Sequence, residues 1–237
     1  MPPSRELHRR QAGSALAIAI AVTLALYWVP FLHWLAWPLL LLSTLAHELG
    51  HGLGALLLGG RLQALLLWPD GSGLAAYSGR FSSLQLATIA ATGLLGPPLA
   101  AFVLLLAGRS SRAAHAALAV FALLLAACVL LWAGSLFTVL VCLALVALLG
   151  LLAWRASPAL SQVVCVFLAV QLALASFSRS DYLFTAQAHT AQGVMPSDVA
   201  QIAAALWLPY WFWGGLIALL SLALLALGAW RFAHALR

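Results

Sequence analysis

The sequence predicts an all-α polytopic membrane protein, and its composition, its hydropathy and the spacing of its apolar runs carry that prediction. Of the 237 residues, 65% are hydrophobic and only 7% are charged, which excludes an ordinary soluble domain with a charged surface. The mean hydropathy is +1.07. Long apolar runs recur along the chain, each near the roughly 20 residues that a helix needs to cross a bilayer. We therefore expect a single integral membrane domain over residues 1–237.

The apolar runs predict about seven transmembrane helices. The first run follows a basic segment but is long and lacks a small-residue cleavage site, so we interpret it as a retained helix and not as a signal peptide. Four expected crossings separate the loop at 59–85 from the loop at 178–206, which predicts that both loops lie on the same side of the membrane. The runs lie at about 15–36, 39–58, 86–107, 113–132, 135–154, 159–177 and 207–228.

The charged residues and cysteines exclude some classes of partner and site. All eleven basic residues are arginine, and the formal net charge is +6. Between membrane helices, arginines cap the spans and contact lipid headgroups, so we expect the lipid bilayer and no nucleic acid as a partner. Cys128, Cys142 and Cys165 lie inside apolar runs, where a thiol behaves as a small hydrophobe. They predict neither disulfides nor a thiolate metal site.

The loop at 59–85 has the pattern of a short β-hairpin between the second and third expected helices. Gly59-Gly60 ends a helix, an apolar strand follows, and Pro69-Asp70-Gly71-Ser72-Gly73 forms a turn from which Leu74 to Tyr77 returns. Unpaired strand edges are not tolerated in lipid, so such a hairpin must be buried in protein or line a wet cavity. Its edge can accept an extended substrate by strand addition.

A group of ionisable residues interrupts the second apolar run. His47-Glu48-Leu49-Gly50-His51 places two imidazoles at i and i+4, on one helical face, with a carboxylate beside the first. Two histidine ligands and a glutamate base are the groups that zinc-dependent peptide hydrolysis uses. Glu48 is the only charged residue within the seven runs, and an intramembrane charge is functional by default. The alternative is a polar patch that joins helices, with Gly50 and Gly54 as packing residues.

A third metal ligand must come from another segment. Other HExxH classes use a histidine six residues after the second or a downstream glutamate, but position 57 is Leu57 and no glutamate follows Glu48. Asp70, Asp181, Asp198 and the remaining histidines are left as candidates, and we expect an aspartate from a later segment, Asp181 or Asp198 of the loop at 178–206. Asp198 follows Ser197 before a run of helix formers and is equally consistent with a helix N-cap. Asp181 is also consistent with a surface residue, and Asp70 with local bonding in its turn.

With these motifs the chain resembles the site-2 protease superfamily of intramembrane zinc metalloproteases, and more closely its compact bacterial branch without a PDZ domain. The resemblance implies that His47 and His51 bind Zn²⁺, that Glu48 activates water, and that an aspartate of a later helix, Asp198 or Asp181, is the third ligand. It also implies that the substrates are membrane proteins. The segments that carry it are 47–51, 59–60, 69–73 and 93–97, and more thinly 180–181, 197–199 and 208–209.

Gly96-Pro97-Pro98, near the centre of the third run, predicts a kinked or broken helix because two backbone donors are missing. Such a break near a buried zinc would offer backbone groups to an unfolded substrate, which makes Gly96 and Pro97 candidate substrate-binding residues. The alternative is a kink that serves packing alone.

We therefore predict an intramembrane zinc metalloprotease that hydrolyses peptide bonds of membrane-embedded substrates, with a polar cavity toward the hairpin side. Its expected location is the cell membrane, as a multi-pass protein of the bacterial inner membrane; the sequence gives no oligomeric state. The alternatives are a catalytically degenerate homologue that acts as a membrane binding or regulatory protein, and a metal-binding transporter.

Overall fold

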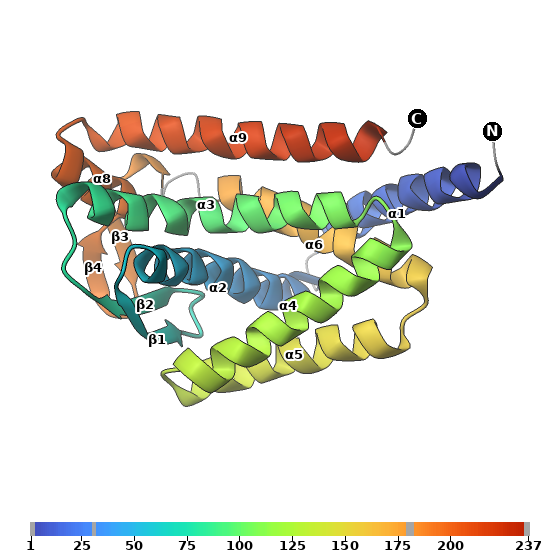
Figure 1. Cartoon of the computed structure of the whole chain (residues 1–237), viewed down its shortest axis with the longest axis horizontal. Coiled ribbons are helices and arrows are strands. Elements are labelled where there is room, and N and C mark those ends of the chain that lie inside the picture. Colours follow the sequence, from blue (N-terminus) through green and yellow to red (C-terminus); the bar gives the residue numbers. More distant parts are fainter. Residues whose placement is uncertain (1–2, 30–31, 179–182, 235–237) are drawn as a thin grey trace.

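Helices dominate the computed structural model, which describes residues 3–29, 32–178 and 183–234. In these ranges the chain forms eight helices and four strands, arranged as Figure 1 shows. In chain order they are α1 (Pro3–Trp28), α2 (His33–Leu57), β1 (Arg61–Leu67), β2 (Gly73–Ser78), α3 (Ser83–Ala107), α4 (Ser111–Trp132), α5 (Leu136–Arg155), α6 (Pro158–Ser178), β3 (Gln187–Thr190), β4 (Gly193–Pro196), α8 (Asp198–Leu206) and α9 (Tyr210–His234).

The long helices confirm the predicted membrane fold. Five of them, α3, α4, α5, α6 and α9, are long and apolar enough to cross a membrane. α1 carries a shorter apolar stretch, Arg10–Leu26, and α2 carries the motif with two histidines and a glutamate. The boundary of the first helix differs from the expected one, since α1 ends at Trp28 and α2 begins at His33. Pro30 stands between them in the sequence, and proline disfavours helix in the residue before it.

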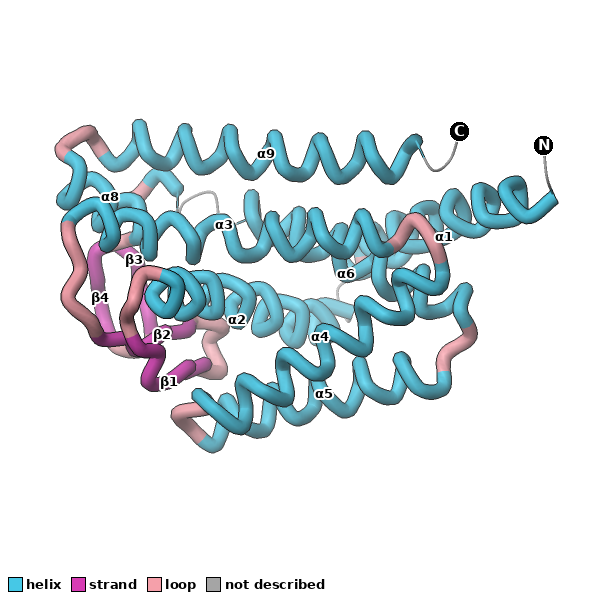
Figure 2. The backbone as a smooth tube through the Cα atoms, in the orientation of Figure 1, coloured by secondary structure: helices cyan, strands magenta, loops and turns pink. Residues whose placement is uncertain are grey.

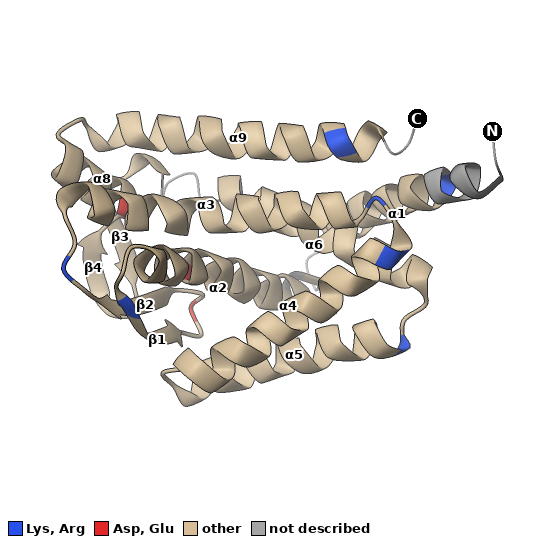
Figure 3. Cartoon of the chain, in the orientation of Figure 1, with Lys and Arg blue, Asp and Glu red and all other residues tan. Residues whose placement is uncertain are grey.

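Arginines mark the ends of the helices. Figure 3 shows the basic residues of the described chain at helix ends and in loops, away from the middle of the bundle. The Arg155 guanidinium lies 3.9 Å from the ring centroid of Trp154, and that of Arg231 lies 5.2 Å from that of Trp230. Arginine and tryptophan together are typical of the membrane interface.

Small residues bring α2 and α3 together. A Cβ atom at Gly50 would meet the backbone of Thr92, and one at Gly54 would meet its side chain. A Cβ atom at Gly96 would meet the carbonyl of Ala46 on α2. Close backbone approach of this kind is how membrane helices pack without a hydrophobic driving force between them. The α2–α3 contact is therefore tight at the level of the histidine motif.

The break expected in the third membrane helix is not found. α3 runs without interruption from Ser83 to Ala107, and Pro97 and Pro98 are both buried within it. α3 packs against α2, α6 and α9. Membrane helices tolerate proline where neighbouring helices support the freed backbone groups, so this packing keeps the helix continuous.

In the first hairpin, no further strand of the described chain pairs with the outer edge of β2. β1 and β2 are antiparallel, with Leu65 opposite Ala75. The α4–α5 connection covers the outer edge of β1: the N–H of Gly134 donates to the carbonyl of Leu65 at 2.9 Å, and the N–H of Leu67 donates to Thr138 Oγ1 at 2.9 Å. Leu65 therefore directs its backbone groups outward, away from β2. In an antiparallel pair, the residue opposite such a residue also directs its N–H and C=O outward. Ala75 therefore directs its N–H and C=O to the outer edge of β2.

A second hairpin joins the first at one end of the bundle. β3 pairs antiparallel with β4, with Ala188 opposite Met195, and Figure 2 shows all four strands gathered at this end. The N–H of Ala191, at the tip of the second hairpin, donates to the hydroxyl of Ser72 in the turn of the first at 3.2 Å. The two loops therefore lie on the same side, as predicted.

The Thr138→Val substitution tests the anchoring of β1. Valine keeps the shape of threonine but removes the acceptor of the Leu67 N–H, which then stays buried without a partner. We expect the free energy of unfolding to fall by about 1–3 kcal/mol, measured as a lower midpoint of thermal unfolding in detergent. Thr88→Val is the control, because Thr88 is exposed and its hydroxyl donates to Leu84 within its own helix. An equal shift in both variants would contradict the anchoring role.

Candidate metal centre

α2 directs two imidazoles toward one point. His47 and His51 lie one helical turn apart, and their rings meet edge to face with centroids 4.6 Å apart and an interplanar angle of 89°. Their Nε2 atoms are 3.1 Å apart. The i, i+4 spacing thus produces the shared face that the sequence predicts.

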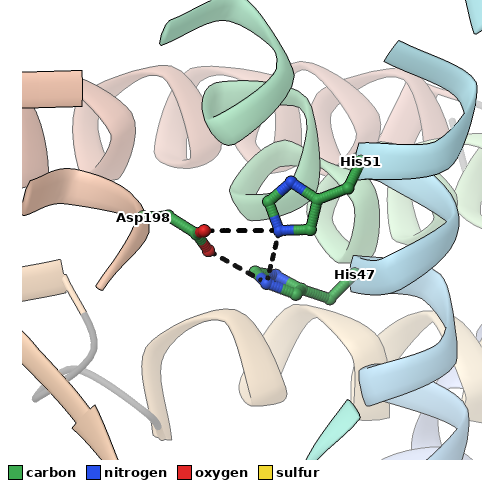
Figure 4. Close-up of side chains that lie close together, drawn as sticks. All are labelled: His47, His51 and Asp198. Atoms are coloured by element: carbon green, nitrogen blue, oxygen red, sulfur yellow. Dashed lines mark hydrogen bonds and ion pairs between the residues drawn. The ribbon is translucent and has the colours of Figure 1, made fainter. Parts of the chain in front are cut away.

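Asp198 meets these imidazoles from α8. Ser197 is the N-cap of this helix, and its hydroxyl oxygen accepts the N–H of Ala200. Since serine provides the cap, Asp198 is the first helical residue, and its side chain points toward α2 (Figure 4). Its Oδ2 lies 3.0 Å from Nε2 of His47, and its Oδ1 lies 3.4 Å from Nε2 of His51.

These three side chains form a group that can hold a metal ion, with their ligand atoms within 4.8 Å of one another. Nδ1 of His51 lies 2.8 Å from the carbonyl of Ile89. If a metal ion were bound, His51 would be neutral: its Nδ1–H would donate to the carbonyl, and the lone pair of Nε2 would be available to the metal. Oδ2 of Asp198 is buried, and its approach to His47 lacks hydrogen-bond geometry. A cation between the three groups fits both observations.

Asp198 brings a negative charge to this group. Burial alone raises the pKa of its carboxyl, but the charge of His51 and the contacts with both imidazoles outweigh burial and lower the pKa below its usual range. The carboxyl is therefore ionised at neutral pH. A carboxylate and two imidazoles are a donor set that divalent metal ions accept in proteins.

A cavity of about 320 Å³ is lined by His47, His51 and Asp198, the three residues that can hold a metal ion, together with residues of both hairpins. Its walls come from α2, from both hairpins and from α8, which confirms the prediction of a polar cavity toward the hairpin side. The lining residues with polar side chains are His47, Glu48, His51, Tyr77, Thr190, Ser197, Asp198 and Gln201.

Glu48 lies in the wall of this cavity with only 6% of its surface exposed. A Cβ atom at Gly73 would lie 2.7 Å from Cγ of Glu48 and 2.6 Å from Cγ2 of Thr44, so only glycine lets β2 come this close. The backbone amide of Ala75 is within hydrogen-bonding reach of the Glu48 carboxylate. The hydroxyl of Thr44 donates to the carbonyl of Gly71 at 2.7 Å and holds the hairpin in this place.

Residues 17–228 match the family model described as Peptidase M50B-like. The chain belongs to the Peptidase M50B-like family. This assignment confirms the resemblance to the site-2 proteases, which are intramembrane metalloproteases, and agrees with the membrane-spanning helices of the fold. The comparison with curated proteins and the comparison with solved structures each found no match.

In this M50B-like chain, Gly96 and Pro97 do not line the cavity that Glu48, His47, His51 and Asp198 share. Pro97 borders a second cavity of about 40 Å³, together with Ser43 and His47. Gly96 packs against the backbone of Ala46. Their role in substrate binding stays a prediction.

The other predicted aspartates are not part of the cluster described. Asp181 lies outside the described residues. Asp70 stays in the turn of the first hairpin, where its Oδ1 accepts hydrogen bonds from the N–H of Ser72 at 2.9 Å and from the hydroxyl of Ser72 at 2.7 Å.

The second hairpin of this M50B-like fold was not predicted from the sequence. Ala188, Thr190 and Met195 of that hairpin line the cavity opposite β2. The available signal is Gly193, which ends the turn with a φ of 110°, a conformation that favours glycine. The strands are only four residues long, too short for an alternating pattern to identify.

The Gly93→Ala substitution tests how α3 positions the second histidine. A Cβ atom at Gly93 would overlap the imidazole of His51, so the ring must turn away from Ile89 and Asp198. We expect the affinity for Zn²⁺ to fall by about 10- to 100-fold, as for loss of other groups that orient a metal-bound histidine, measured by titration of metal-free protein. Gly150→Ala is the control, because a Cβ there meets nothing within 4 Å. Unchanged affinity in Gly93→Ala would contradict this positioning.

Proposed function

We propose that this protein is an intramembrane zinc metalloprotease that hydrolyses peptide bonds of membrane-embedded protein substrates. In this proposal His47, His51 and Asp198 bind the metal and Glu48 is the general base. The observation that carries it is the convergence of two Nε2 atoms and one carboxylate, from two helices far apart in sequence, at the wall of a cavity that Glu48 also lines. The family assignment adds a peptidase context.

Zinc suits the donor set. Three protein ligands of nitrogen and oxygen type are typical of catalytic zinc, whereas structural zinc sites are closed by four ligands. Bound there, zinc supplies a Lewis acid that polarises a carbonyl and lowers the pKa of water at the open position. The Ile89 carbonyl, 2.8 Å from Nδ1 of His51, would orient that ligand from outside the site.

Glu48 is suited to move protons during hydrolysis. Its carboxylate is buried in the cavity wall, one residue from His47 and beside the backbone amide of Ala75. It would take a proton from the attacking water and deliver it to the leaving amine when the C–N bond breaks. The cavity of about 320 Å³ is large enough to hold several waters, which this reaction needs at a site within membrane helices.

The outer edge of β2 is suited to hold the substrate in an extended form. A transmembrane helix keeps its carbonyls in internal hydrogen bonds, so its peptide bonds must be unwound before attack. The α4–α5 connection covers the outer edge of β1, while Gly73 and Ala75 of β2 line the cavity. An extended segment that pairs with this edge would pass beside Glu48.

Metal content and cleavage measured together test the proposal. In purified protein we expect about one zinc per chain and cleavage of a model transmembrane substrate. Glu48→Gln should retain zinc, and its rate of substrate cleavage should fall by about 10²- to 10⁴-fold, which is the contribution of a general base. The zinc affinity of Asp198→Ala should fall by more than roughly 10- to 100-fold, which is the loss found when a residue hydrogen-bonded to a metal ligand is removed.

Two further variants separate the aspartates. Asp70→Asn is the control, because Asp70 bonds within its own turn, and it should retain both zinc and cleavage. Asp181→Ala tests the other candidate ligand. Loss of zinc in Asp181→Ala but not in Asp198→Ala would contradict the proposed ligand set. Absence of zinc from well-folded wild-type protein would instead favour a binding or regulatory membrane protein.

A further inference from the structure

Tyr77 lines the same cavity as Glu48. No hydrogen bond of its hydroxyl group is found among the described residues. Tyr77 lies on β2 and lines the cavity together with Glu48 and Asp198. The buried side-chain atoms without a partner, in the part of the chain described, are Gln162 Oε1, Asp198 Oδ2 and Trp213 Nε1. The Tyr77 oxygen is not one of them, so it is not buried, and Tyr77 is part of the cavity lining.

The ring of Tyr77 is held in place by the hydrophobic core and by the ring of Phe81. Side chains alternate along a strand, so Tyr77 shares a face of β2 with Gly73 and Ala75, the two residues that approach Glu48. The ring packs against the main hydrophobic core and meets Phe81 edge to face, with centroids 6.0 Å apart. A ring fixed in this way gives its hydroxyl a defined position in the cavity wall.

The hydroxyl stays protonated in this setting. Burial, and then the charges of Asp198 and Glu48, raise the pKa of Tyr77 above its usual range. A neutral phenol is a hydrogen-bond donor at every pH near neutrality.

The other side chains of the cavity that can donate are already engaged. The hydroxyl of Ser197 donates to the carbonyl of Thr185 at 2.6 Å, and that of Thr190 donates to the carbonyl of Gly193 at 3.1 Å. The amide of Gln201 lies 3.4 Å from Asp198 Oδ1. Among the polar side chains that line the cavity, and apart from the two histidines, Tyr77 is therefore the one with a hydrogen-bond donor available to a substrate.

We propose that Tyr77 donates a hydrogen bond to the oxyanion that forms during peptide hydrolysis, which makes it a catalytic residue of the proposed protease. When the water oxygen bonds to the carbonyl carbon, the π electron pair of the C=O bond moves to the carbonyl oxygen, and a proton of the water passes to Glu48. The charge on that oxygen is greatest in the tetrahedral state, so a donor placed there accelerates the reaction more than it strengthens substrate binding. Tyr77 remains neutral throughout. This inference depends on the proposed function.

Tyr77→Phe removes the hydroxyl and keeps the ring. We expect kcat to fall by about 100-fold, the size found for loss of an oxyanion donor, with KM, zinc content and thermal unfolding unchanged. A phosphinic peptide that mimics the tetrahedral state should bind the zinc-loaded variant more weakly by a similar factor. The uncleaved peptide, measured in the Glu48→Gln background, should bind equally well with Tyr77 and with Phe. Tyr210→Phe is the matched control, because Tyr210 does not line this cavity.

Each result supports or overturns the role of Tyr77. Unchanged kcat, or equal losses of affinity for the phosphinic peptide and the uncleaved peptide, would overturn it. If the wild type cleaves no peptide, the proposed function fails, and the comparison of the two peptides still decides whether Tyr77 recognises a tetrahedral oxyanion. If the wild type is active, and Tyr77→Phe loses both activity and affinity for the phosphinic peptide but not for the uncleaved peptide, the proposed function stands and Tyr77 has the role assigned.

Discussion

The contact of one carboxylate with two imidazoles, between α8 and α2, is the interaction on which the rest of the structure depends. Ionisable groups are costly inside a membrane protein unless they are paired or bind a metal. His47 and His51 meet Asp198 at 3.0 and 3.4 Å, and this pairing compensates for their burial. It also determines where the C-terminal part of the chain must lie, because α8 can reach α2 only if the second hairpin folds beside the first. The cavity is the space that remains between these elements.

Glycine at a few positions makes this arrangement possible. Gly93 leaves room for the His51 ring against α3, and Gly50 lets the two helices approach at the same level. Gly73 does the same for β2, which approaches the side chain of Glu48 where any larger residue would collide. Gly93 and Gly73 each bring backbone close to an ionisable side chain, and Gly50 brings the two helices together. The same glycines therefore allow the helices to pack and give the site its geometry.

The sequence was sufficient for the parts of the fold that depend on local patterns. Apolar runs give the long helices, and the turn at 69–73 gives the first hairpin. The histidine motif places two ring nitrogens on one helical face. The role of Asp198 was open, because Ser197-Asp198 also fits a helix cap; serine takes the cap, and the aspartate at the next position turns toward α2.

Features that depend on tertiary contacts were not predictable from those patterns. The four-residue strands β3 and β4 are positioned by a hydrogen bond from Ala191 to Ser72, 119 residues away in sequence. α3 stays continuous through Pro97 and Pro98 because its neighbours support it, although local rules predict a break. Gly96 packs against Ala46 of α2, and Pro97 lies beside Ser43 and His47 of the same helix. The cavity that Glu48 lines is formed by α2, α8 and the two hairpins.

X-ray absorption at the zinc edge of the Asp198→Cys variant tests the central claim most directly. If Asp198 is a ligand, cysteine at this position replaces an oxygen ligand by sulfur, which has a longer bond to zinc of about 2.3 Å. We expect one sulfur ligand in this variant, with two imidazole ligands retained, and no sulfur ligand in the wild type. Zinc bound to the variant with a spectrum identical to that of the wild type would contradict the account, because the third ligand would then come from another residue.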